Sequence, residues 1–219
     1  SGMSWPISSS PMPSVMLDAT ALGWTSVGIN NGFISFGPAG ECFSQMDGRQ
    51  VATAAVDHPS GPIQLTRKVY VPNIGAGFAR IVDTVRNTSD TAVTVTLWAD
   101  QYSDAGLQVV GTSSGDTTVD VTDDWVSTKT AFPHAVIVHG AGGTAASQLF
   151  ESPSNLVRAA WNDLSVPAGG QVSLMQIMVQ GAPGAAGEAA VADSAMQLAT
   201  LPKATLVGMT KAELTGLVN

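Results

Sequence analysis

Residues 63–100 constrain the fold most, because three strand-like runs, at residues 63–71, 78–85 and 93–99, follow one another there with only short connections. In residues 63–71 apolar side chains occupy most of the odd positions and polar side chains most of the even ones. This period of two is typical of a half-buried strand. The alternation returns over residues 93–99, after a polar segment at 87–90 that predicts a tight turn. The stretch therefore predicts an antiparallel β core.

Similar runs on both sides extend the prediction to an antiparallel β-sandwich. Two early hairpins are expected at Asn30-Asn31-Gly32 and Asp47-Gly48, because Asn, Asp and Gly tolerate the positive φ of tight turns. Later strands are expected at residues 107–110, 117–122, 125–128, 135–139, 146–150, 156–161 and 172–179. Roughly a dozen short strands at this spacing are typical of a sandwich.

The C-terminal part predicts helices. After Gly181 the apolar period changes to that of a helix, over about residues 186–200. The sequence Thr210-Lys211-Ala212-Glu213 is a capping box, which predicts a second short helix over residues 210–218. Residues 1–14, rich in Pro and Ser, are expected to form an extended lead-in or linker, and residues 15–219 a single all-β domain with this helical segment.

Charge and composition limit the partners. The net charge is −8 with nine Lys and Arg, so no basic patch is available for nucleic acid. The single cysteine, Cys42, excludes an internal disulfide. No apolar run of about 18 residues predicts a transmembrane helix. An acidic, Lys-poor sequence favours an exported protein at the cell surface or outside the cell, with the export signal and other domains of a larger parent protein outside these residues. The alternative is an acidic cytosolic protein, because the same composition occurs there.

Residues 100–124 concentrate carboxylates without any Lys or Arg. Clustered carboxylate oxygens can bind calcium, which makes Asp116, Asp120, Asp123 and Asp124 candidate ligands. The alternative is a solvated acidic face, because the spacing matches no EF-hand loop. No other cofactor is expected.

Aromatic and histidine side chains are the candidate ligand-binding residues. Trp98 and Trp125 could stack on a sugar ring, although Trp98 could equally belong to the core. His134 follows a proline and His139 precedes a Gly-rich loop, so either could line a cleft at a loop end or lie on the surface. Because no GxSxG, HExxH or P-loop motif is present, no catalytic residue is predicted.

Several segments together resemble β-sandwich modules of large exported bacterial proteins, and more broadly galactose-mutarotase-like supersandwiches. They are residues 67–72, 78–87, 114–117 and 166–170. The similarity covers about residues 67–179, and its motifs specify strands and turns, so no catalytic residue is carried over from it. The resemblance implies a sandwich of a type that accompanies carbohydrate-active enzymes.

Two functions follow as hypotheses. The first is a non-catalytic module of an exported or cell-surface protein, used for adhesion, spacing or presentation, with a glycan or a cell-surface protein as its partner. The second is a carbohydrate-binding or carbohydrate-processing sandwich, in which Trp98 or Trp125 stacks on the sugar beside carboxylates of residues 100–124.

Overall fold

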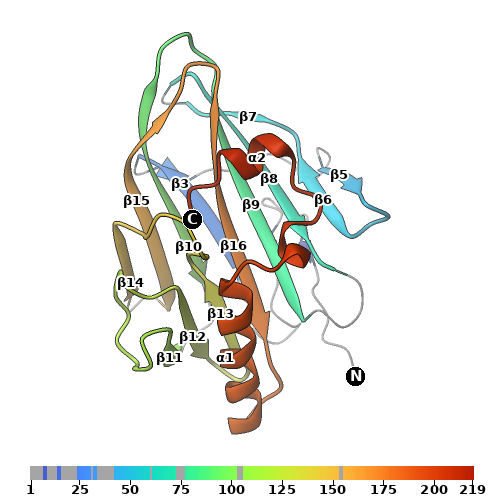
Figure 1. The fold of residues 1–219 in the computed structure, drawn as a ribbon, viewed down its shortest axis with the longest axis vertical. Coiled ribbons are helices and arrows are strands. Elements are labelled where there is room, and N and C mark those ends of the chain that lie inside the picture. The colour runs from blue at the N-terminus through green and yellow to red at the C-terminus, as the bar shows by residue number, and fades with distance from the viewer. Residues whose placement is uncertain are drawn as a thin grey trace.

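Two antiparallel sheets form the body of the protein (Figure 1). The computed structural model describes residues 7–8, 14–15, 24–30, 32–33, 42–59, 61–72, 77–102, 106–152 and 155–219. The smaller sheet consists, in order, of β14 (Gln148–Ser152), β15 (Leu156–Val166), β10 (Val93–Tyr102), β3 (Trp24–Ile29) and β4 (Gly32–Phe33). The predicted antiparallel β-sandwich with a helical C-terminal segment is therefore confirmed.

The larger sheet places β9 near its middle. Its strands are, in order, β11 (Gln108–Thr112), β12 (Trp125–Lys129), β13 (Pro133–Ile137), β16 (Gln171–Gln180), β9 (Phe78–Asn87), β8 (Ile63–Tyr70), β6 (Gln50–Thr53) and β5 (Cys42–Gln45), with β7 (Val56–Asp57) beside β8. Two further short strands, β1 (Ile7–Ser8) and β2 (Ser14–Val15), pair with each other, so the predicted lead-in contains a ladder. The rest of residues 1–14 lies outside the described residues.

The main core lies between the two sheets. Leu65 of β8 and Val85 of β9 pack in one buried cluster with Leu97 of β10 and Trp161 of β15. Complete burial of one such aliphatic side chain stabilises a fold by about 1.5–3 kcal/mol. The indole N–H of Trp161 donates to the carbonyl of Thr144 at 3.0 Å, so the ring is buried without an unsatisfied donor.

The three runs of residues 63–100 are consecutive in the sequence but do not lie in one sheet. β8 pairs with β9, whereas β10 crosses to the smaller sheet and pairs with β15 and β3. Residues 88–92 therefore connect the two sheets and do not close a hairpin. Asn87 holds this connection, since its amide donates to the carbonyls of Thr91 and Val166 at 2.7 and 3.2 Å.

A correction concerns residues 117–122, which were predicted as a strand and lie in a loop between β11 and β12. The carboxylate of Asp116 accepts from the backbone N–H of Thr118, and that of Asp120 accepts from Thr122, each at 2.8 Å. Such local bonds satisfy the backbone and compete with a strand ladder. The β-branched residues alone had favoured a strand.

The early hairpins lie close to where the turn signals place them. β5 and β6 are joined through residues 46–49, because Gln45 pairs with Gln50. The loop thus has four residues, and Met46, Asp47 and Gly48 all have positive φ of 53–83°. β3 and β4 pair around Asn30, whose φ is 47°. Residues 31 and 34–36 of that second prediction lie outside the described residues.

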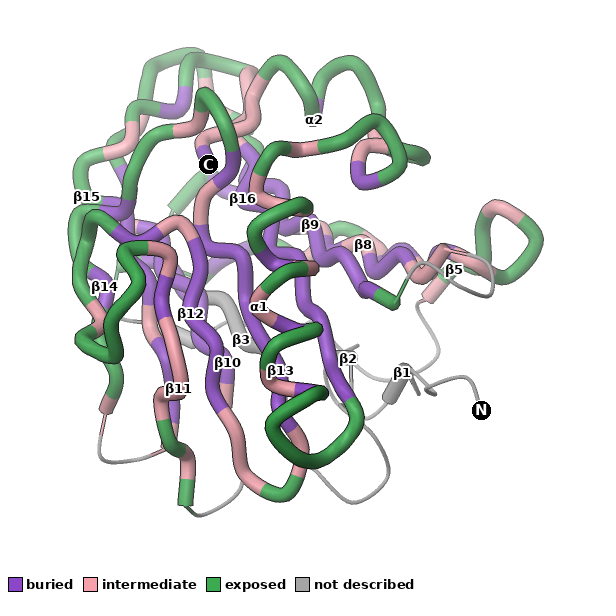
Figure 2. The backbone as a smooth tube through the Cα atoms, turned by 60° about the horizontal axis from the view of Figure 1, so that its bottom comes forward, coloured by how far each residue is buried: buried purple, intermediate pink, exposed green. Residues whose placement is uncertain are grey.

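Helices cover the outer face of the larger sheet (Figures 1 and 2). α1 (Ala185–Ala199) lies over β12 and β13, and its Val191 and Ala195 pack against Trp125 and Ile137. A 3-10 helix, η1 (Lys203–Leu206), and α2 (Lys211–Thr215) follow it. The buried guanidinium of Arg80 holds the η1 region by donating to the carbonyls of Thr205 and Val207, both at 2.7 Å. None of the described helices is long and apolar enough to span a membrane.

The capping box of α2 is formed. Thr210 Oγ1 accepts from the N–H of Glu213 at 3.2 Å, and Glu213 Oε2 accepts from the N–H of Thr210 at 2.7 Å. Glu213 also forms an ion pair with Lys68 of β8 at 2.7 Å, which fixes the helix to the sheet. Burial would raise the pKa of Glu213, but the hydrogen bonds from Lys68 and Thr210 outweigh it, so that this pKa is lowered.

Candidate functional site

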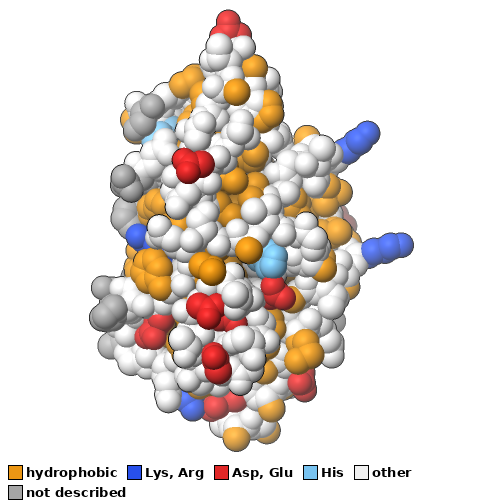
Figure 3. All heavy atoms as spheres, turned by 60° about the vertical axis from the view of Figure 1, so that its left-hand side comes forward, with side chains coloured by type: hydrophobic (Ala, Val, Ile, Leu, Met, Phe, Trp, Pro, Cys, Tyr) orange, Lys and Arg blue, Asp and Glu red, His pale blue; other side chains and the backbone are white. Residues whose placement is uncertain are grey.

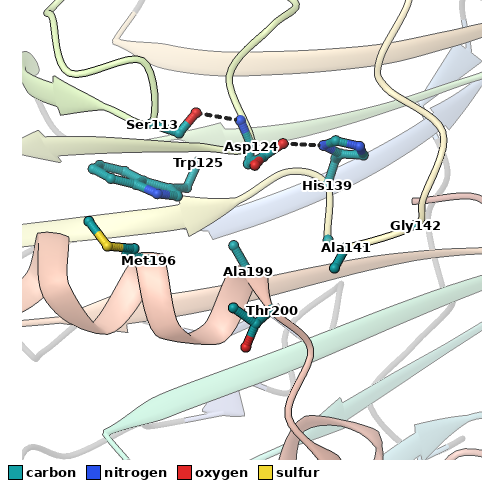
Figure 4. A pocket seen from close by; sticks show the side chains of 10 residues that line it. Ser113, Asp124, Trp125, His139, Ala141, Gly142, Met196, Ala199 and Thr200 are labelled. Carbon is teal, nitrogen blue, oxygen red and sulfur yellow. Dashed lines mark hydrogen bonds and ion pairs between the residues drawn. The ribbon is translucent and has the colours of Figure 1, made fainter.

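A pocket of about 380 Å³ opens where the C-terminal end of α1 meets the start of β12 and the loop after β13 (Figure 4). Its lining consists of Ser113, Asp124, Trp125, His139, Gly140, Ala141, Gly142, Met196, Ala199 and Thr200. Four segments that are distant in the sequence therefore meet here. Three of the residues singled out from the sequence, namely Asp124, Trp125 and His139, lie in this one pocket.

An aspartate and a histidine form the polar centre of the pocket. His139 Nδ1 lies 2.6 Å from Asp124 Oδ1. The backbone carbonyl of Asp124 accepts from the N–H groups of Val138 and His139 at 2.8 and 3.1 Å, so the two side chains are held together by the backbone as well. The side chain of Asp124 is 47% exposed and that of His139 is 22% exposed. Within the described part of the chain, His139 Nε2 and Asp124 Oδ2 have no hydrogen-bond partner and are available to a ligand.

Ser113 shapes the pocket without joining this pair. Its hydroxyl oxygen accepts from the backbone N–H of Asp124 at 2.7 Å, and its O–H donates to Asp123 Oδ1 at 3.3 Å. The proton of Ser113 thus points at Asp123 and not at His139. A nucleophilic serine needs a base within hydrogen-bond reach of its own hydroxyl, and this arrangement does not supply one.

The other walls of the pocket are apolar or backbone. Trp125 is largely buried, and its indole lies beside the thioether of Met196, which is 60% exposed (Figure 4). Met is flexible and polarisable, so this wall can adapt to a ligand. Opposite it, the N–H of Ala141 donates to the carbonyl of Ala199 at 2.8 Å. This bond ties the Gly-rich loop to the end of α1.

The segment around Asn219 supports the loop that carries His139. Asn219 Oδ1 accepts from the N–H of Met175 at 2.7 Å, and Nδ2 donates to the carbonyls of Met175 and Val138. The neighbouring carbonyl of Val218 accepts from Thr144 at 2.6 Å. A Cβ at Gly143 would lie 2.5 Å from the carbonyl carbon of Asn219, so only glycine allows this approach.

The Asn219→Ala variant should therefore be less stable by about 1–3 kcal/mol, because the N–H of Met175 loses its acceptor in a buried position. Urea unfolding followed by tryptophan fluorescence measures this loss. Asn162→Ala is the matched control, since Asn162 lies exposed on β15. Equal midpoints for the two variants would show that the Asn219 carboxamide does not support the fold.

The four aspartates predicted as calcium ligands make different contacts in the structure. Asp123 is buried and accepts from the backbone N–H groups of Ser114 and Asp120, each at 3.1 Å. Hydrogen bonds from the hydroxyl and N–H of Thr122 lower the pKa of Asp120. Asp116 binds Thr118, as described above, and Asp124 pairs with His139. Across the described residues, no three Asp, Glu, His or Cys side chains come together as a metal site.

Trp98 is not in the pocket. It lies on the outer face of the smaller sheet with 6% of its surface exposed, and the Arg158 guanidinium covers its ring at 4.5 Å from the centroid. Asp100 holds that guanidinium through two bonds of 2.6 Å. Little indole surface is therefore left exposed for a sugar ring.

His134 is an interior residue and does not belong to the lining of this pocket. It is 2% exposed, and its Nε2 lies 2.7 Å from the hydroxyl of Thr128. Burial lowers the pKa of His134 to about 4, although the contact with the carbonyl of Phe132 acts in the opposite direction. Its imidazole is therefore neutral at physiological pH and completes the sheet interior.

Sequence reasoning missed the pocket residues that α1 supplies. Met196 belongs to the predicted helix of residues 186–200, and in the structure it is exposed at the pocket. The helical period of residues 186–200 gave no signal of a site, because it does not tell which strand the helix covers. Asp124, Trp125 and His139 were singled out as separate candidates, and nothing in the sequence placed them together.

No protein-family model and no curated protein matches the chain. Among solved structures, a galactose mutarotase-related enzyme from Lactobacillus acidophilus is similar, with 10% identity and a TM-score of 0.44 over 74% of this chain and 83% of that one. A galactose mutarotase-like protein from Lactobacillus casei gives 8% identity and 0.44 over 73% and 84%. A polysaccharide lyase gives 11% and 0.46 over 88% of this chain and 34% of the lyase. These similarities have TM-scores below 0.5 and transfer neither a substrate nor a site residue to this chain.

Proposed function

We propose that the protein is a non-catalytic β-sandwich module that binds carbohydrate in the pocket of Asp124 and His139. The observation that carries the proposal is the composition of this pocket, in which a free carboxylate oxygen and a free imidazole nitrogen lie beside the apolar wall of Trp125 and Met196. Sugars present hydroxyl groups and apolar C–H faces together, which such a wall and such polar groups can match. The volume of about 380 Å³ suits a small ligand.

The chemistry of the pocket favours binding over hydrolysis. Most glycoside hydrolases use two carboxyl groups, one as acid and one as base or nucleophile. The lining offers the single carboxyl group of Asp124, and this group is paired with His139. The Ser113 hydroxyl is directed away from His139, which supports the same interpretation.

The proposal extends to the cellular role. An acidic chain with few Lys and Arg suits a module that is exported and presents its pocket at the cell surface, for adhesion to a glycan. Antibody labelling of intact, unpermeabilised cells tests whether the protein lies at the cell surface. Labelling that needs permeabilisation would contradict it, without bearing on the pocket.

A glycan array and affinity gels with neutral polysaccharides test the binding. The wild type should be retained, and His139→Ala should weaken retention about tenfold or more, because a hydrogen-bonding group at the centre of the pocket is lost. EDTA should leave retention unchanged, since Asp124 contacts His139 directly. Gln148→Ala, an exposed change at the start of β14, is the control. Absence of retention on every glycan, or retention that His139→Ala leaves intact, would refute the proposed function.

A further inference from the structure

The described lining of the pocket carries negative charge from a carboxylate and no positive charge from Lys or Arg. This carboxylate belongs to Asp124. Its Oδ1 is engaged by His139, while Oδ2 faces no protein donor in the described residues and the side chain is 47% exposed. A ligand that enters the pocket therefore meets an acceptor oxygen that carries negative charge.

The sequence around Asp124 carries further negative charge and little positive charge. The loop that leads into Asp124 carries Asp116, Asp120 and Asp123, and residues 106–128 contain no Lys or Arg. Lys129 is already paired with Glu188 at 2.9 Å. Figure 3 shows a face of the molecule on which acidic side chains outnumber basic ones and a histidine lies next to an acidic group.

We propose that the pocket discriminates between sugars by their charge: it binds amino sugars with a free ammonium group more tightly than neutral sugars, and it rejects uronic acids. The inference rests on the proposed carbohydrate binding and names the class of ligand. Asp124 determines this order of affinities. An ammonium group donates to Oδ2 and is attracted by the negative charge, whereas a sugar carboxylate is repelled by it.

Two matched series of monosaccharides test the order. Glucose, glucosamine and glucuronic acid share one ring, and the corresponding galactose series covers the other common configuration. Dissociation constants are measured by NMR titration at low salt and again at 0.5 M NaCl. We expect the amino sugar to bind about threefold to tenfold more tightly than the neutral one at low salt, in the range of partly exposed ion pairs, and the difference to shrink at high salt.

The Asp124→Asn variant separates charge from shape. It keeps an oxygen that can accept from His139 but removes the negative charge, so the amino-sugar preference should disappear while neutral sugars still bind. Asp90→Asn, an exposed change of the same charge in the connection between β9 and β10, should keep the preference. Equal affinities within each series, or tighter binding of the uronic acids, would overturn this inference and leave carbohydrate binding standing. If no sugar of either series and no neutral polysaccharide binds, the proposed function itself fails.

Discussion

Replacing Asp83 with alanine should lower the free energy of unfolding by about 3–5 kcal/mol, the cost of leaving a buried charge without its partner. Asp83 of β9 and Arg67 of β8 face one another on the interior side of the larger sheet, with their side chains 3% and 0% exposed. Two bonds join them, from Nε to Oδ1 at 2.6 Å and from Nη2 to Oδ2 at 2.8 Å. Equilibrium unfolding in urea measures the change.

The exposed Asp57→Ala variant on β7 is the control for this experiment. Its carboxylate accepts a hydrogen bond from Gln64 at 2.9 Å on the solvent side of the same sheet, so its loss should cost little. The double variant Arg67→Met with Asp83→Leu should recover part of the stability, because an apolar pair needs no compensation of charge. A single Asp83→Ala variant that is as stable as Asp57→Ala would show that the buried pair is not required.

Acid should destabilise the protein through His134. Its pKa is about 4 in the folded protein and 6.5 in the unfolded chain, so the unfolded chain binds more protons between these values. The stability that the neutral imidazole contributes is complete above pH 6.5 and is lost as the pH falls toward 4. A difference of this size corresponds to about 3 kcal/mol.

Unfolding free energies of the wild type and of His134→Gln at pH 7, 5.5 and 4.5 check this expectation. Glutamine keeps a polar group near Thr128 but does not titrate, so the variant should lose less stability between pH 7 and 4.5 than the wild type. Other carboxylates contribute to acid unfolding in both proteins, and the difference between the two isolates the histidine. Parallel pH profiles would contradict the assignment.

The strands were predictable from the sequence because alternation is a local property. Leu65 and Leu97 belong to the alternating runs of residues 63–71 and 93–99, and both are buried in the core between the sheets. The pairing of strands, in contrast, is not a local property. Strand β9 is buried on both faces and pairs with β16 as its second neighbour, although β10 follows it in the chain. The loop at residues 113–124 was misread for a related reason, since Asp116 and Asp120 act through side-chain bonds that a hydropathy pattern does not record.

The candidate site was predictable in its parts and not in its assembly. Asp124, Trp125 and His139 were each singled out from the sequence, but so were Trp98 and His134, which the fold buries elsewhere. A lone aromatic or histidine gives the same signal in a pocket and in a core, and only the tertiary contacts separate the two.

The contacts of Asn219 also determine where the loop that carries His139 lies. Asn219 and Val138 are 81 positions apart in the sequence, and the carboxamide that donates to Val138 also bonds to the backbone of Met175 in β16. The wall of the pocket at His139 is therefore positioned jointly by the C-terminal residues and by β16, so that a change far away in the sequence can displace it.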